Sequence, residues 1–225
     1  MDKDVWTSMD FKCSLALAVD KFPRAKDNLQ AVFLQNVIKH PALKTGVAIG
    51  VYDMEKKLIA LAVGGRSSSD ILSTFHHELG HAIDMGLSAD EDAQWARLYT
   101  KKLRADGYEK PLGPEKWMRA PVWKSFPSRY CLHSQGEYFA EHIQEVAKDE
   151  VRHLHIYPQE HQLIRDMGIL PKDPTPIPHF HVELQDAVFN SSSRYHPLRV
   201  LRCPTPRDRR RYRFLRGRPN QRAAA

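Results

Sequence analysis

Cysteine is scarce in this chain of 225 residues. The three cysteines, Cys13, Cys131 and Cys203, lie far apart, and no CxxC pair occurs. Their number and spacing exclude a framework of several disulfides and a zinc site built from thiolates. The protein is therefore expected to fold without disulfides in a reducing compartment.

Long apolar runs are also missing. No stretch approaches the roughly 20 residues that a membrane-spanning helix needs. The longest run near the start, CSLALAV, is too short for the core of a signal peptide and follows acidic residues. We therefore predict no transmembrane segment. The expected location is the cytoplasm, or the exterior by a route that uses no conventional signal peptide.

The chain has a net charge of +7, but residues 1–193 lack any excess of positive charge. Residues 194–225 hold eleven arginines and one acid, a net charge of +10, which leaves −3 for residues 1–193. Prolines multiply and periodicity fades after residue 171. We predict a folded domain over 1–170 and a weakly packed extension over 171–225, disordered from about residue 193. The arginines could bind nucleic acid or an anionic surface, but without a recognisable binding module a solvated tail is the main interpretation.

Periodicity and capping signals predict the secondary structure. Helical patterns occur in five segments: 24–40, which Pro41 ends, 67–86 and 89–107, which have start signals and a final glycine, 134–151 and 158–167. The sequence GVAIGVYDMEKKLIALAVGG predicts two strands around a turn at 53–57. Residues 107–130 form a long irregular segment, in which Trp117 and Trp123 either wall a cleft or anchor the loop.

His77, Glu78 and His81 form an HExxH motif within the segment 67–86. Because residues i and i+4 share one face of a helix, both imidazoles can bind one zinc ion. Glu78 follows the first ligand and is placed to act as the general base on an attacking water. Gly80 would let another element pack closely. Chance would produce this motif only about 0.03 times in a chain of this composition, so a helix with incidental histidines is the weaker interpretation.

A catalytic zinc site needs a third protein ligand. The metzincin pattern requires glycine where this chain has Asp84 and a ligand where it has Leu87, so that pattern is excluded. The helical segment 134–151 offers Glu137 and, one turn later, Glu141. We predict Glu137 as the ligand and Glu141 as the partner of a ligand histidine's free ring nitrogen, with the reverse assignment left open. Asp84 either orients a ligand histidine or closes the helix end.

The sequence HELGHAID, together with EYFAE, resembles the catalytic domain of anthrax lethal factor and its relatives, which include the Pro-Pro endopeptidases. These proteins are gluzincins, in which a distal glutamate completes the HExxH site. Over roughly residues 45–150, the resemblance implies an α+β zincin-like fold with a small twisted sheet, one zinc ion per chain and a protein substrate. It also implies a zinc metalloendopeptidase, with a role as a toxin or effector among the options.

The resemblance implies two further features of the site. The family places a tyrosine seven residues before the ligand glutamate, which is Tyr130 here, and its hydroxyl would stabilise the oxyanion or donate to the leaving amine. The strand ending in LIALAVGG resembles the family's substrate-binding edge, which would hold an extended peptide by strand addition. The residues assigned to this edge are Leu58, Ile59, Ala60, Leu61, Ala62 and Val63.

Two other functions fit parts of the sequence. A DNA-associated zinc protease would use His133 or His142 as the third ligand and place the basic tail on DNA. A zincin without activity would serve as a binding module. The presence of Glu78 argues against the second option, because an inactive site has no need of a base.

Overall fold

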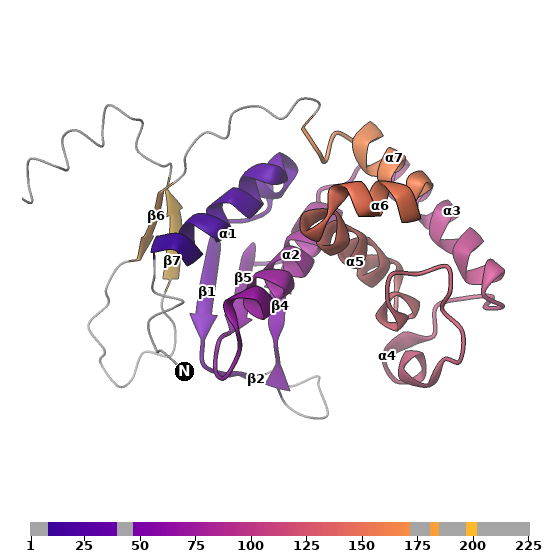
Figure 1. The fold of residues 1–225 in the computed structure, drawn as a ribbon, viewed down its shortest axis with the longest axis horizontal. Helices are drawn as coiled ribbons and strands as arrows, with labels where there is room; N and C mark the ends of the chain where they lie inside the picture. The colour runs from indigo at the N-terminus through magenta and orange to yellow at the C-terminus, as the bar shows by residue number, and fades with distance from the viewer. Residues whose placement is uncertain (1–8, 40–46, 172–180, 185–196, 202–225) are drawn as a thin grey trace, which may run out of the picture.

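The computed structural model describes residues 9–39, 47–171, 181–184 and 197–201, and its α+β class confirms the class predicted from the sequence (Figure 1). Within these residues, no helix is both long and apolar enough to cross a membrane. The helices are α1 (Met9–Lys21), η2 (Pro23–Asp27), α2 (Ser68–Asp84), α3 (Ala89–Ala105), α4 (Gly113–Lys116), η3 (Trp117–Arg119), η4 (Arg129–Leu132), α5 (Gln135–Lys148), α6 (Glu150–Ile156) and α7 (Pro158–Asp166).

The strands form one mixed sheet and one small two-stranded sheet. They are β1 (Ala31–Gln35), β2 (Ile38–Lys39), β3 (Val47–Ala48), β4 (Gly50–Asp53), β5 (Leu58–Ala62), β6 (His181–Leu184) and β7 (Pro197–Leu201). The five-stranded sheet has the order β4-β5-β1-β7-β6, in which β1 and β5 are parallel and the other pairs antiparallel. β2 and β3 pair with each other. The hairpin predicted around residues 53–57 is confirmed as β4 and β5.

Helices α2 and α5 lie between the sheet and the outer helices α3, α6 and α7 (Figure 1). Apolar side chains from β5, α2 and α5 join in one core, where Ile59, Phe75 and Phe139 are fully buried. The hydroxyl of Ser67 caps α2 by accepting from the Asp70 amide, as the sequence predicts. Helix α5 therefore packs against α2 within this core.

The helix predicted over residues 24–40 is wrong. The segment forms the short η2 turn and then strands β1 and β2. A short apolar run is compatible with either a helix or a strand. β1 buries alternate residues, Val32 and Leu34, and its backbone pairs with β5 on one side and β7 on the other. These distant partners decide the conformation.

The assignment of Leu58–Val63 to a substrate-binding edge is also wrong in this structure. β5 pairs with β4 on one side and with β1 on the other, so its backbone groups are already used. The strand at the free end of the sheet beside α2 is β4. The strand is apolar because both of its faces are covered: Ile59 and Leu61 pack in the main core, and Ala60 and Ala62 pack in a second cluster.

Strands β6 and β7 lie within the segment 171–225, which the sequence analysis assigned to a weakly packed extension. β7 occupies residues predicted to be disordered, yet it pairs with β1 through Val32–Leu198 and Phe33–Pro197. The rest of the extension, including most of the arginines, lies outside the described residues. The division of the chain at residue 170 stays a prediction.

Candidate metal centre

The close packing of α2 and α5 brings the candidate ligands together. Gly80 lies against Ala140, and a Cβ atom placed on Gly80 would be only 2.5 Å from the Cα atom of Ala140. The glycine thus allows the close approach that the sequence predicts. A second contact between the helices, which the sequence analysis missed, is the 2.6 Å hydrogen bond from Gln144 to the hydroxyl of Ser73.

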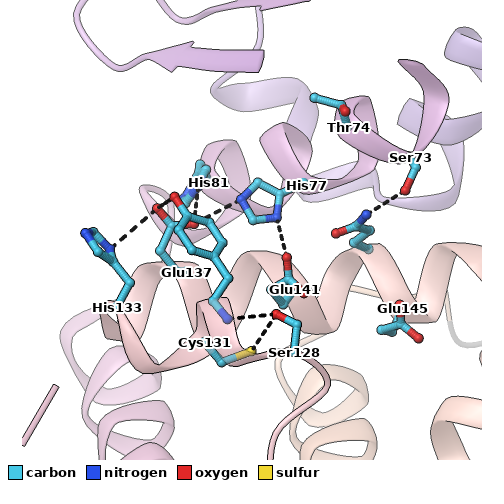
Figure 2. A network of polar contacts seen from close by, with 12 residues as sticks. Ser73, Thr74, His77, His81, Ser128, Cys131, His133, Glu137, Glu141 and Glu145 are labelled. Carbon is cyan, nitrogen blue, oxygen red and sulfur yellow. Dashed lines mark hydrogen bonds and ion pairs between the residues drawn. The ribbon is translucent and has the colours of Figure 1, made fainter. Parts of the chain in front are cut away.

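The side chains of His77, His81 and Glu137 converge between the two helices (Figure 2). The Oε2 atom of Glu137 lies 3.0 Å from Nε2 of His77 and 3.4 Å from Nε2 of His81. The potential ligand atoms of all three residues lie within 4.8 Å of one another. Glu141 is not in this group, so the structure favours Glu137 over Glu141 as the third ligand.

Two of these separations, those from Glu137 to each histidine, are compatible with a bound metal ion such as zinc. Zinc bonds to imidazole nitrogen and carboxylate oxygen of about 2.0–2.2 Å, at tetrahedral angles, put ligand atoms about 3.3–3.5 Å apart. The observed 3.0 and 3.4 Å are close to that spacing. The set of two imidazoles and one carboxylate suits zinc better than magnesium or calcium, which prefer oxygen ligands.

Glu141 lies on the opposite side of the His77 ring. Its Oε1 atom is 3.3 Å from Nδ1 of His77, as Figure 2 shows. A carboxylate there favours the proton on Nδ1 and leaves the lone pair of Nε2 directed at the cluster. This is the role that the sequence analysis assigns to Glu141.

The carboxylates of Glu137 and Glu141, which flank His77, require a compensating positive charge between them. Burial disfavours a charged imidazole at His77, but hydrogen bonds to Glu137 and Glu141 outweigh this and raise the pKa of His77 to about 10. Burial likewise works against the charge on Glu137, but hydrogen bonds from His77 and His81 hold the pKa of this carboxyl well below its usual range. Either an imidazolium or a metal cation must supply the charge.

Glu78 lies between the cluster of His77, His81 and Glu137 and the edge strand β4. Its side chain is nearly buried, and a Cβ atom on Gly50 would lie 2.6 Å from Oε1 of Glu78. The backbone amide of Tyr52 donates to the carboxylate. Burial raises the pKa of Glu78, opposed by the nearby His81 and His77. A raised pKa brings a carboxylate closer to the range in which a general base works at neutral pH.

Tyr130 reaches the cluster from η4, at the end of the long irregular segment. Its hydroxyl donates a 2.7 Å hydrogen bond to Oε1 of Glu137. Burial, followed by the charge of Glu137, raises the pKa of Tyr130, so the hydroxyl keeps its proton. The ring packs edge-on against Trp117 at 4.8 Å. Trp117 therefore packs against a residue of the site. Trp123 instead makes a cation–π contact with the guanidinium group of Arg129.

Asp84 lies at the last turn of α2. Burial raises the pKa of Asp84 to about 6, partly opposed by the charge of His81. A Cβ atom on Gly136 would lie 3.3 Å from its Oδ2 atom, so Asp84 approaches the start of α5. Its influence on His81 is electrostatic.

The two histidines offered as alternative third ligands lie in different places. His142 is fully buried and hydrogen-bonds through Nδ1 to His153 at 2.8 Å, outside the metal cluster. His133 lies near the cluster, with Nδ1 3.8 Å from Oε1 of Glu137. The structure therefore places His133 beside the cluster, but not in the group of candidate ligands.

No known protein family, curated protein or solved structure matches this chain. The function is therefore inferred from the chemistry of the site itself.

Proposed function

We propose that this protein is a zinc-dependent metalloendopeptidase of the gluzincin type. The observation that carries the proposal is the convergence of His77, His81 and Glu137 with ligand spacing that suits zinc. Glu78, the candidate base, lies next to the first of these residues. The resemblance of the HELGHAID and EYFAE sequences to the catalytic domain of lethal factor and its relatives supports the same function.

The proposed roles follow from the position of each side chain. His77, His81 and Glu137 would hold the zinc ion, which supplies Lewis-acid chemistry by polarising a substrate carbonyl. Glu78 accepts a proton from the attacking water and passes it to the leaving amine. Glu141 keeps the His77 ring in the orientation and tautomer that ligation needs.

The proposed substrate is a peptide in extended conformation. The free edge of β4 is the only unpaired strand edge beside α2 among the described residues of the sheet. A peptide that adds to this edge would pass next to Glu78, because Gly50 and Tyr52 of β4 both contact that carboxylate. This replaces the assignment of the edge to residues 58–63.

The metal content of the purified protein tests the proposal first. We expect about one zinc ion per chain by elemental mass spectrometry after dialysis against zinc. Glu78→Gln should retain the zinc and lose nearly all cleavage of a peptide library, because only the proton acceptor is removed. Glu137→Ala should lose most of the zinc.

Glu145→Ala provides the matched control. Glu145 lies on the same helix as Glu137, two turns later, and pairs with Lys148 at the surface. This variant should keep both zinc and activity. Wild-type protein that holds no zinc after supplementation would overturn the proposal, and the cluster would then be an ion pair between protonated His77 and its two glutamates.

A further inference from the structure

The two carboxylate oxygens of Glu137 have different surroundings. Oε2 lies toward His77 and His81, at 3.0 and 3.4 Å. Oε1 accepts the 2.7 Å hydrogen bond from Tyr130. One oxygen is therefore directed at the metal cluster, and the other is held by the protein.

The groups around Oε1 are fixed by packing. The Tyr130 ring stacks on His133 with ring centres 5.6 Å apart and meets Trp117 edge-on. The Tyr130 amide donates to the hydroxyl of Ser128 at 3.1 Å, which anchors the start of η4. Tyr130 therefore has little freedom to swing its hydroxyl away from Glu137.

His133 makes a weaker contact with the same oxygen. Its Nδ1 atom lies 3.8 Å from Oε1 of Glu137, which is an ion-pair distance and too long for a hydrogen bond (Figure 2). This nitrogen is buried and has no hydrogen-bond partner among the residues that the structure describes. The environment of Oε1 thus contains one strong donor and one ring nitrogen that a small movement would bring into bonding range.

We propose that Tyr130, assisted by His133, is a positioning residue that holds Oε1 of Glu137 so that the carboxylate offers a single oxygen to the metal. This inference rests on the proposed metal site. Single-oxygen ligation leaves a coordination position open for water and substrate, which a catalytic zinc site requires. The role differs from the oxyanion role that the family resemblance implies, because here the hydroxyl is already engaged by a ligand.

The two roles predict different properties for Tyr130→Phe. If the hydroxyl positions Glu137, its loss should weaken zinc binding by about 10–100-fold, the usual effect of removing a group that orients a ligand. If the hydroxyl acts only on the oxyanion, zinc binding should be unchanged and turnover alone should fall, by about 10²–10³-fold. Phenylalanine keeps the ring, so the packing against Trp117 and His133 should survive.

The experiment measures the zinc Kd by competition with a chelator for wild type, Tyr130→Phe and the control Tyr108→Phe. The Tyr108 hydroxyl donates to the backbone carbonyl of Val122 at 2.8 Å and has no contact with the cluster. We expect the Kd to rise only in Tyr130→Phe. The visible spectrum of the cobalt-substituted protein, which responds to coordination number, should also change in that variant alone.

His133→Gln is a second variant that tests the proposal if Tyr130→Phe folds poorly. It should also weaken zinc binding, by a smaller factor than Tyr130→Phe. An unchanged Kd and an unchanged cobalt spectrum in Tyr130→Phe would overturn the positioning role, with or without a fall in turnover. Wild-type protein without zinc affinity would overturn this inference together with the proposed function, so the two failures are distinguishable.

Discussion

Gly80 sets the distance between the two helices that carry the candidate ligands. It stands between His77 and His81 on α2, where the backbone of α5 comes closest at Ala140. Any side chain at this position would meet backbone atoms, which cannot move aside as the end of a flexible side chain can. The geometry of the candidate ligands therefore depends on the lack of a side chain at Gly80.

We expect Gly80→Ala to destabilise the protein and weaken its zinc binding. Alanine favours a helix over glycine by about 1 kcal/mol, but forcing a methyl group into a close-packed interface costs typically about 1–3 kcal/mol. Since the clash separates α2 from α5, zinc affinity should fall as well. Thermal melting and chelator competition measure the two effects.

Gly136→Ala is the matched control for this substitution. Gly136 also lies in a helix, but a Cβ atom there would meet side-chain atoms alone, the carboxylate tip of Asp84 at 3.3 Å and the hydroxyl of Ser134 at 4.0 Å. We expect a melting temperature equal to or slightly above that of wild type. Gly80→Ala with normal stability and normal zinc affinity would show that the helices can separate without damage to the site.

At the scale of elements, three histidines connect three helices. His142 of α5, His153 of α6 and His161 of α7 are all buried. Nδ1 of His142 is 2.8 Å from Nε2 of His153, and Nδ1 of His153 is 3.2 Å from Nδ1 of His161. Arg165 donates to Nε2 of His161 at 3.0 Å. Because arginine can only donate, it fixes the direction of every hydrogen bond in the chain of neutral rings.

This arrangement predicts a loss of stability in acid. Burial and then the charge of His161 lower the pKa of His153 to about 4, and burial also lowers the pKa of His142 and His161. Nearby charges from Lys102, Glu160, Glu150 and Lys21 modify these shifts. The folded-state pKa values lie below the unfolded value of 6.5. The stabilisation is therefore complete above about pH 6.5 and falls as the pH decreases toward 4.

Urea unfolding at pH 7, 6 and 5 measures the effect. The free energy of unfolding should fall by about 1.4 kcal/mol per pH unit for each proton taken up on unfolding. His153→Gln should be less stable at pH 7 but should show a flatter pH profile. The metal cluster is common to both proteins, so the difference between the profiles isolates the histidine chain. Parallel profiles would contradict the prediction.

The elements that could be predicted from the sequence are those with local signals. The helix around His77 has a serine cap before it and a glycine after it, and α5 has a capping serine, Ser134, and one apolar face. β1 has no such signal, because its conformation depends on pairing with strands far along the chain. The separate helix α6 was missed, since Asp149 adopts an extended conformation that ends α5 and caps α6.

The residues of the site also divide into those with a local sequence signal and those without one. The i, i+4 spacing of His77 and His81 predicts a shared helix face from local geometry alone. Glu137 was predicted as the third ligand from its place on a second helical segment, and Tyr130 was found through the resemblance to a family pattern. The structure places both at the cluster. The histidine chain draws one ring from each of three helices, so no periodicity in the sequence could indicate it.

At the scale of the whole molecule, the sheet joins distant parts of the chain. β1 near residue 31 pairs with β7 near residue 197, and β7 separates β1 from β6. Truncation after Ser193 would remove β7 and expose the second edge of β1. We expect a lower melting temperature and self-association of the truncated protein, because an unpaired strand edge can pair with another chain.

Light scattering after size exclusion, together with thermal melting, tests this expectation. Truncation after Leu201 is the control, because it retains β7 and removes nine arginines of the tail. That form should remain as stable as the full chain. Zinc binding should survive in both truncated forms, since its ligands lie on α2 and α5. A monomeric, fully stable protein that ends at Ser193 would show that β7 adds nothing to the sheet.

The pairing of β1 with β7 also orders events during biosynthesis. Both ligand-bearing helices are complete once Lys148 has been synthesised. β7 follows roughly fifty residues later, which is about 3–10 s at typical rates of synthesis. A nascent chain can therefore assemble the two helices that carry the candidate metal ligands while one edge of β1 is still unpaired. Newly made chains should be most vulnerable to mispairing in that interval, when a chaperone that shields strand edges would have its greatest effect.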